Sequence, residues 1–378
     1  MKRLIKLLIT CSLLLILIGC KEKHNRIIVI SDLHYLSQSL YNNSYYFDEM
    51  MKHADAKITA YSDLLLDSLI EDIKDLNVDA IILLGDMSFN GEKISHEELS
   101  KRFKELNLPI LAIPGNHDLN NIYAREYKGK GYTSTETIGK EEFEGIYNSP
   151  YVTKDKESLS YIFKLNDVNL LFLDVNASKT YDKISDNTLK WIKNNINKNE
   201  KTIAFSHQNL LTHVLYSQDF LIYNNQEVKD LYKELNIKIN FTGHIHLQNI
   251  SYDDNLIEIA TSSMSVSPLQ YGIIDIYKDH LEYNTRQVNN DKLQKVASEF
   301  FDSKSKSSLS AYADDMDLIS YYVKCNSDFF KGKRDELIYD EEKIEAISSL
   351  NNFAGNYLKL MFLEDKKDDN HLSISLEK

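Results

Sequence analysis

The chain has 378 residues, of which 43% are hydrophobic and 27% charged, and its formal net charge is −13 at pH 7. This length allows one large domain and a smaller one, and the composition is that of an ordinary globular protein. Because so acidic a surface repels phosphate backbones at long range, the charge excludes duplex DNA or RNA as an expected partner, while the oligomeric state is left undetermined.

The first 19 residues are predicted to be a targeting segment. A basic start precedes the apolar stretch 7–18, which is too short to span a bilayer by itself. The stretch ends in Leu-Ile-Gly followed by Cys20, which resembles the bacterial lipobox. That resemblance implies a removed signal peptide, two acyl chains on Cys20, and a lipid-anchored protein on the extracytoplasmic face of the cell membrane. An ordinary secretory signal or an uncleaved anchor is the alternative.

Short apolar runs then alternate with helical periods. The first three predicted strands are 27–30, 81–84 and 110–113. One helix is predicted over 61–76, and a capping box formed by Ser95 and Glu98 predicts another that ends near Leu106. This βαβαβ series predicts a mostly parallel sheet.

The second half of the chain is predicted to hold more strands and then helices. Residues 119–158 are polar and rich in tyrosine, so we expect an insertion with short helices near the site. A hairpin is expected over 160–175, followed by a helix with Trp191 and Ile192 on its apolar face and a strand over 203–206. A helix over 228–235, a strand over 237–242, and short strands with turns over 249–286 are expected next. From 289 to 378 the periods are helical, which predicts a small C-terminal domain after a 20–288 domain, with its last dozen residues frayed.

Polar side chains collect where the predicted strands end. They are Asp32, His34, Asp86, Asn116, His117, His207, His244 and His246. In an open α/β sheet, ligands bind beyond the carboxyl ends of the strands. Carboxylate, imidazole and amide oxygen suit borderline to hard divalent ions, and the absence of cysteine from this set argues against a structural zinc knot. The set is large enough for two ions, with one carboxylate between ions ~3.5–4 Å apart.

The pattern resembles the calcineurin-like metallophosphoesterases, whose blocks are D-x-H, G-D, G-N-H-[DE], H and G-H-x-H. Five matching blocks occur here in the same order, at Asp32-Leu33-His34, Gly85-Asp86, Gly115-Asn116-His117-Asp118, His207 and Gly243-His244-Ile245-His246. The resemblance covers about residues 26 to 288. It implies an α/β fold, the four-layer α/β/β/α sandwich of that family, followed here by the helical domain.

The resemblance also implies a role for each residue. The ligands of the first ion would be Asp32, His34 and His246, those of the second Asn116, His207 and His244, and Asp86 would bridge both. A hydroxide between the ions would be the nucleophile. His117 would not be a ligand but would stabilise charge or protonate the leaving oxygen, and Asp118 would orient it or cap the following turn. Mn, Fe and Zn all suit such ligands, so the metals are not identified.

A finer resemblance concerns the substrate. Residues 31–36, 85–92 and 95–98 resemble class III cyclic nucleotide phosphodiesterases and related bacterial lipoproteins, in which Asn90 lies near the mouth of the site. We therefore expect a binuclear metal-dependent phosphodiesterase of small phosphoesters. Export leaves open a phosphomonoesterase or a phosphodiesterase of envelope polymers or lipid head groups, because cyclic nucleotides are mostly made inside cells. A non-catalytic ligand-binding lipoprotein is the remote alternative.

Other titratable residues are expected to have no part in the chemistry. His213 has apolar neighbours and His96 follows the first residue of the predicted capping box, so both are expected to be structural. Cys325 is expected to be a lone buried thiol. His53 and Asp55 are expected to be solvated.

Overall fold

The computed structural model describes residues 24–41, 44–53, 55–177, 182–214, 220–312, 314–363 and 365–376. The predicted signal peptide and lipidation site, Cys20, lie outside these residues. Within the described ranges, no helix is both long enough and apolar enough to cross a membrane.

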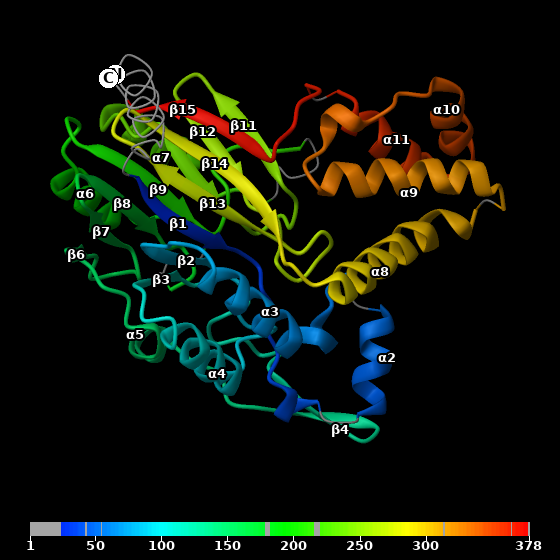
Figure 1. Ribbon diagram of the computed structural model, residues 1–378, viewed down its shortest axis with the longest axis horizontal. Helices are drawn as coiled ribbons and strands as arrows, with labels where there is room; N and C mark the ends of the chain where they lie inside the picture. The colour runs from blue at the N-terminus through cyan, green and yellow to red at the C-terminus, as the bar shows by residue number, and fades with distance from the viewer. Residues whose placement is uncertain are drawn as a thin grey trace, which may run out of the picture.

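Two large sheets form the centre of the molecule (Figure 1). Across the described residues, the first has the strand order β15-β14-β13-β1-β2-β3. Its members in chain order are β1 (Asn25–Ile30), β2 (Ala80–Leu84), β3 (Ile110–Ile113), β13 (Gln270–Ile276), β14 (His280–Gln287) and β15 (His371–Ser375). β1, β2 and β3 are parallel, as predicted, because α3 (Ser62–Lys74) and α4 (Lys93–Lys104) provide the crossover connections.

The second sheet has the order β11-β12-β10-β9-β8-β7-β6 in the described part of the chain. Its members are β6 (Thr153–Lys154), β7 (Tyr161–Leu165), β8 (Val168–Leu173), β9 (Lys201–Ser206), β10 (Ile239–Thr242), β11 (Asn249–Asp253) and β12 (Leu256–Ala260). The predicted hairpin is confirmed as β7–β8, and the strands β8, β9, β10 and β12 run parallel. These parallel strands bring several carboxyl ends to one edge.

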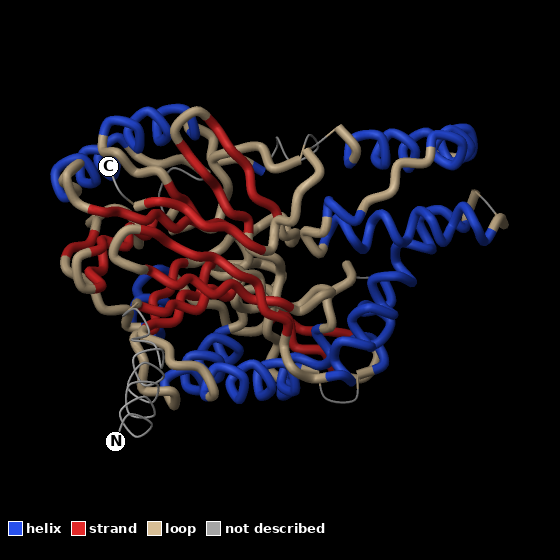
Figure 2. The backbone as a smooth tube through the Cα atoms, turned by 45° about the horizontal axis from the view of Figure 1, so that its top comes forward, coloured by secondary structure: helices blue, strands red, loops and turns tan. Residues whose placement is uncertain are grey.

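Side chains of the central strands alternate between two apolar layers. In β2, Ile82 and Leu84 face the other sheet, where Phe172, Phe205 and Phe241 stack across β8, β9 and β10. The intervening residues of β2 pack against α3 and α4. The outer face of the second sheet is covered by α6 (Asp186–Asn195) and α7 (Asn225–Glu234). Strands therefore lie inside and helices outside (Figure 2), and the predicted four-layer α/β/β/α sandwich is confirmed.

Four helices follow the sandwich: α8 (Asp291–Ser310), α9 (Met316–Phe330), α10 (Glu341–Leu350) and α11 (Asn352–Met361). They share an apolar cluster in which Cys325 is buried as a free thiol, as expected. In Figure 1 these helices lie on the side to which the carboxyl end of β1 points. The helical character after residue 289 agrees with prediction, and the division into two domains at residue 288 stays a prediction.

The described part of the last dozen residues is not frayed, because it contains β15, so the prediction is wrong as far as residue 376. After α11 the chain returns to the sandwich, where β15 pairs antiparallel with β14. Leu372 and Ile374, two residues apart, pack on the apolar layer between the sheets. A short alternation of apolar and polar residues within a charged segment was therefore sufficient to form an edge strand.

The insertion at 119–158 contains less helix than predicted. It forms a hairpin from β4 (Arg125–Lys128) and β5 (Gly131–Ser134), one helix, α5 (Lys140–Tyr147), and the short edge strand β6. The hairpin packs on α2 (Tyr45–His53) through Tyr127 and Phe47. This unit lies beside the loops that follow β1 and β2, because Leu36 and Phe89 belong to the same apolar cluster.

Candidate metal centre

The predicted site residues do meet, at the carboxyl ends of strands from both sheets. They follow β1, β2, β3, β9 and β10 and are Asp32, His34, Asp86, Asn116, His117, His207, His244 and His246. Left-handed backbone, with φ between 44° and 70°, occurs at Asp32, His34, Asp86, His244 and His246. Such a conformation costs a side-chain-bearing residue on the order of 1–2 kcal/mol and persists where the surroundings impose it. The surrounding structure therefore imposes local backbone strain at these five residues, and this strained backbone directs their side chains into the site.

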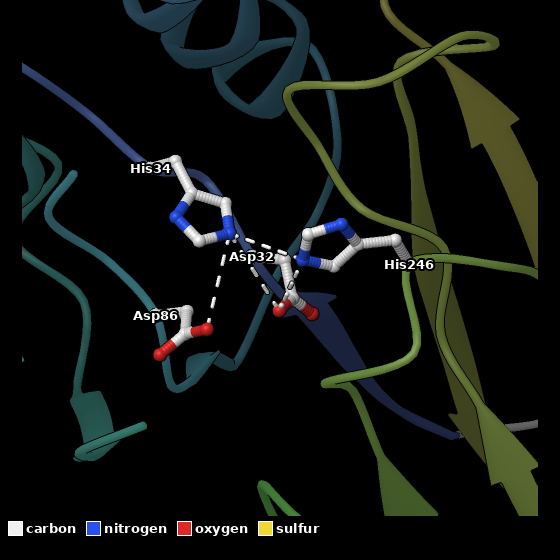
Figure 3. A group of neighbouring side chains, drawn as sticks. All are labelled: Asp32, His34, Asp86 and His246. Atoms are coloured by element: carbon white, nitrogen blue, oxygen red, sulfur yellow. Dashed lines mark hydrogen bonds and ion pairs between the residues drawn. The ribbon is translucent and has the colours of Figure 1, made fainter. Parts of the chain in front are cut away.

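A first group of candidate ligands consists of Asp32, His34, Asp86 and His246. Their ligand atoms all lie within 4.8 Å of one another. Figure 3 shows the four side chains converging, with Nε2 of His34 3.1 Å from Nε2 of His246. Nε2 of His246 is also 3.3 Å from Oδ1 of Asp32. These are the residues that the resemblance assigns to the first ion and to the bridge.

A second group consists of Asp86, His207 and His244. Nε2 of His207 is 3.4 Å from Oδ2 of Asp86 and 3.2 Å from Oδ1 of Asn116. The opposite ring nitrogen, Nδ1, donates to the Leu84 carbonyl at 2.8 Å, which leaves a lone pair on Nε2 for a ligand. Asp86 belongs to both groups, which is the arrangement expected of a bridging carboxylate.

Asp86 divides its two oxygens between the backbone and the site. Oδ1 accepts the backbone N–H of His117 at 2.8 Å, and Oδ2 faces both His207 and His34, the latter at 3.8 Å. Burial opposes its charge, but the charge of His207 and its hydrogen bond to the carboxylate, followed by the charge of His117, outweigh burial and hold the pKa of Asp86 well below its usual range. The bridging position therefore carries an anion at neutral pH.

The donor set fits divalent metal ions. Oδ1 of Asp32 is buried, and its 3.3 Å contact with Nε2 of His246 does not have the geometry of a hydrogen bond. The carboxyl is nevertheless anionic at neutral pH, because His246 and His207 lower its pKa against the effect of burial. Two imidazole Nε2 atoms 3.1 Å apart can share only one proton between them. A cation between these atoms would satisfy both requirements.

The motif glycines have a steric reason. A Cβ on Gly85, whose φ is 86°, would overlap the His207 ring, and a Cβ on Gly115 would overlap the Asp86 carboxylate. The backbone approaches the ligands so closely that only hydrogen fits. The glycines of the G-D and G-N-H blocks are therefore required by close contacts with segments that are far apart in the sequence.

His117 belongs to neither ligand group. Its Nδ1 lies 2.9 Å from the Phe89 carbonyl and 3.2 Å from Oδ1 of Asn90. Both partners are oxygens, so Nδ1 carries the proton and Nε2 is the nitrogen left for chemistry. Asn90 therefore lies at the site, as expected, and helps to orient His117.

Asp118 does not orient His117, so that expectation is wrong. Its buried carboxylate accepts backbone N–H groups from Met87, Ser88 and Gly115 and the Ser88 hydroxyl, at 2.8 to 3.2 Å. It thereby ties the loop after β3 to the loop after β2. The alternative, that Asp118 caps a turn, agrees better with these contacts. Most of the N–H groups that it accepts, however, belong to the loop after β2 and not to the turn that follows Asp118 itself.

Sequence reasoning missed Glu258, which is fully buried against the loop that follows His207. It accepts the backbone N–H groups of Leu210 and Leu211, at 2.7 to 3.0 Å, and Nδ2 of Asn240 at 2.6 Å. His213 also contacts it, at 3.1 Å, in the structural role predicted for that histidine. Glu258 thus holds the loop that follows His207, and an acid inside the apolar run Leu-Ile-Glu-Ile-Ala was the available signal.

Residues 25–248 match the family model described as calcineurin-like phosphoesterase. The chain belongs to this family. Its fold is also similar to that of a dimetal phosphatase from Danio rerio, with a TM-score of 0.53 and 13% identity over 70% of this chain and 96% of the other. Membership of the calcineurin-like phosphoesterases supports a hydrolase of phosphoester bonds, and the two ligand groups support two divalent metal ions.

Curated relatives of this phosphoesterase are named as phosphodiesterases. A "probable cyclic nucleotide phosphodiesterase" of Vesicomyosocius okutanii is 33% identical over 89 residues, which is 24% of this chain and 37% of the relative. A protein of that name in Fibrobacter succinogenes is 24% identical over 230 residues, 58% of this chain and 77% of the relative. A "probable glycerophosphodiester phosphodiesterase" of Arcobacter nitrofigilis is 23% identical over 207 residues, 53% and 67% respectively. The first match therefore spans little more than a third of that relative.

Glu92 lies behind the residues that orient His117. Its Oε2 accepts the Asn90 N–H at 2.9 Å, while Oε1 is buried without a hydrogen-bond partner among the described residues. Glu92 is also the N-cap of α4, so the predicted capping box is wrong: Ser95 lies inside the helix and accepts the Ser37 N–H, and Glu98 accepts the Tyr35 hydroxyl. Burial raises the pKa of Glu92 to about 7.

This raised pKa predicts a pH-dependent stability. Between the ordinary value of 4.5 and about pH 7, folded Glu92 binds more protons than unfolded Glu92, so the protein loses stability as the pH rises through that window. The loss is at most ~1.4 kcal/mol per pH unit. Glu92→Gln keeps an acceptor for Asn90 and carries no charge. We expect its free energy of unfolding in urea, relative to the wild type, to be higher at pH 8 than at pH 5.

The control for this comparison is Glu97→Gln, which changes an exposed glutamate on the same helix. Its difference from the wild type should be the same at both pH values. If the free energy of unfolding of Glu92→Gln relative to the wild type does not change with pH, the buried carboxyl is not protonated in the folded protein.

Proposed function

We propose that the chain is a phosphodiesterase of small phosphodiesters that uses two divalent ions. The observation that carries the proposal is that two groups of candidate ligands share one buried carboxylate, Asp86. The ligands proposed for the first ion are Asp32, His34 and His246, and for the second Asn116, His207 and His244. When bound, such ions polarise the phosphoryl group and supply a water-derived nucleophile near neutral pH.

The residues of the chain account for the rest of the reaction. The Phe89 carbonyl and Asn90 hold Nδ1 of His117, so that its Nε2 can deliver a proton to the leaving oxygen. The backbone N–H of His117 is held by Asp86, so the acid and the bridging ligand move as one unit. Asp118 and Glu258 keep the loops that carry these residues in place.

A diester substrate is supported by the names of the three relatives above, each of which is named as a probable phosphodiesterase. A phosphomonoesterase, or a phosphodiesterase of envelope polymers or lipid head groups, is the alternative. A panel assay of the Mn²⁺-loaded protein separates them, with bis-p-nitrophenyl phosphate, p-nitrophenyl phosphate, cyclic nucleotides and glycerophosphodiesters. We expect diesters to be hydrolysed faster than the monoester. No hydrolysis of any substrate by protein with two bound ions would overturn the proposal and favour a binding lipoprotein.

We further propose that the protein is lipid-anchored through Cys20. The described chain enters β1 at Asn25, whereas Asp32 of the metal centre follows the last residue of the same strand, Ile30. A six-residue strand spans roughly 20 Å, so an anchor before Asn25 joins the sandwich at the far end from the site. This arrangement supports a substrate taken from the aqueous phase rather than from the anchoring bilayer.

The anchor has its own test. Cys20→Ser removes the only sulfur at the predicted processing site, so we expect the leader to stay uncleaved or the protein to leave the membrane fraction. Cell fractionation and the mass of the N-terminal peptide measure both. Cys11→Ser, inside the leader, is the matched control and should be processed normally. Unchanged membrane retention and cleavage of Cys20→Ser would contradict the proposal.

A further inference from the structure

Lys57 is a buried cation beside the metal centre that belongs to neither ligand group. It lies between α2 and the short helix η2 (Thr59–Tyr61) and is only 7% exposed. A lysine is seldom buried to this extent unless its charge is paired. Its Nζ is 3.2 Å from Oδ2 of Asp55, whose side chain is 79% exposed. A desolvated cation thus faces a carboxylate that is itself in solvent, so the expectation that Asp55 is merely solvated was incomplete.

Backbone contacts fix Lys57 next to the first ligand group. The N–H of the following residue, Ile58, donates to the Ser265 carbonyl at 2.9 Å, and the Ser265 hydroxyl donates to the Asp32 carbonyl at 3.1 Å. Ile58 is also buried in the apolar cluster beneath β1. These hydrogen bonds connect the segment that carries Lys57 to the segment that carries Asp32.

The electrostatics agree with this placement. Lys57 lowers the pKa of Asp55 against the effect of burial, and the charges of His246 and His117 lower it further. The pair is therefore within electrostatic reach of His246, in the first ligand group, and of the proposed acid, His117.

We propose that Lys57 binds an anionic oxygen of the substrate phosphoryl group on the side of His34 and His246, and that Asp55 holds the ammonium until the substrate arrives. The inference rests on the proposed function and extends it to a third source of positive charge. Asp55 is well hydrated, so it loses little when a phosphoryl oxygen replaces it. The ammonium is desolvated and offers three hydrogen-bond donors on a flexible stem. It is therefore stabilised by charge-assisted hydrogen bonds to the oxygens of a doubly charged phosphoryl group.

The chemistry indicates which ligands depend on Lys57. A phosphoryl group with two negative charges, such as inorganic phosphate or the monoester product, should depend on it more than a singly charged diester. A charge-assisted hydrogen bond to a buried ion corresponds to about a 10- to 100-fold change in affinity.

The test is calorimetric titration of inorganic phosphate into the Mn²⁺-loaded full chain. Lys57→Met keeps the length of the stem and removes the charge, so we expect phosphate to bind about 10- to 100-fold more weakly with metal content unchanged. Lys57→Arg should recover most of the affinity. Asp55→Asn removes the competing carboxylate and should tighten phosphate binding. Lys52→Met, an exposed lysine on α2, is the matched control and should bind phosphate like the wild type.

Equal phosphate affinity of Lys57→Met and the wild type would overturn the inference, and so would loss of metal from Lys57→Met, which would make Lys57 a support of the ligands. If Lys57→Met does not fold, Asp55→Asn decides: unchanged or weaker phosphate binding overturns the inference. Failure of the proposed function gives a different result, because the wild type itself would then neither bind phosphate nor hydrolyse any ester in the panel.

Discussion

Asp86→Ala is expected to abolish activity and to release metal at the same time. The variant removes the one anion that both ligand groups share, which lies 3.4 Å from Nε2 of His207 and 3.8 Å from Nε2 of His34. We expect the ion content to fall from two per chain to one or fewer. Loss of one charge-stabilising group from an active site typically costs ~10²–10³ in turnover, and loss of an ion adds to it.

The measurements are metal analysis after gel filtration and kcat with bis-p-nitrophenyl phosphate. Asp67→Ala, an exposed aspartate on α3, is the matched control and should keep both ions. If Asp86→Ala retains two ions, Asp86 is not the bridging ligand and the shared-carboxylate assignment is wrong.

His117→Ala is expected to separate catalysis from metal binding. Since His117 belongs to neither ligand group, the ion content should stay near that of the wild type. General acid catalysis is typically worth ~10²–10⁴-fold, so kcat should fall by that factor for substrates with alkoxide leaving groups. It should fall much less for p-nitrophenolate, which leaves without protonation.

His280→Ala, in β14 and remote from the blocks, serves as the control and should leave both rates unchanged. Equal slowing of both substrate types by His117→Ala would make the residue a phosphate clamp instead of an acid. Loss of an ion would make it a ligand. Either result would correct the mechanism without affecting the membership of the family.

Local sequence signals were sufficient for the layers of the sandwich. The strands β1, β2, β3, β9 and β10 are short apolar runs bounded by turn residues, and helical periods lie between them. Such signals depend only on neighbouring residues, so the parallel sheet and the positions of its carboxyl ends could be predicted. The five blocks at those ends were sufficient to predict which side chains would meet.

Long-range partners account for the errors. Ser95 and Glu98 have the spacing of a capping box, but their partners Ser37 and Tyr35 lie 58 and 63 residues away. β15 forms because β14 offers a free edge, and the charged composition around it gives no sign of that edge. Local propensity is a weak preference, and a contact with a distant segment overrides it.

The sequence by itself determined the family, the four layers and the candidate ligands, because these are encoded in periodicity and in motifs of a few residues. The tertiary structure decided what surrounds those ligands. It placed Asp118 across two loops, Glu258 against the loop that follows His207, and the buried Lys57 against Asp55. These roles depend on burial and on hydrogen bonds between segments tens to hundreds of residues apart, and no spacing within the chain records which of these segments will touch.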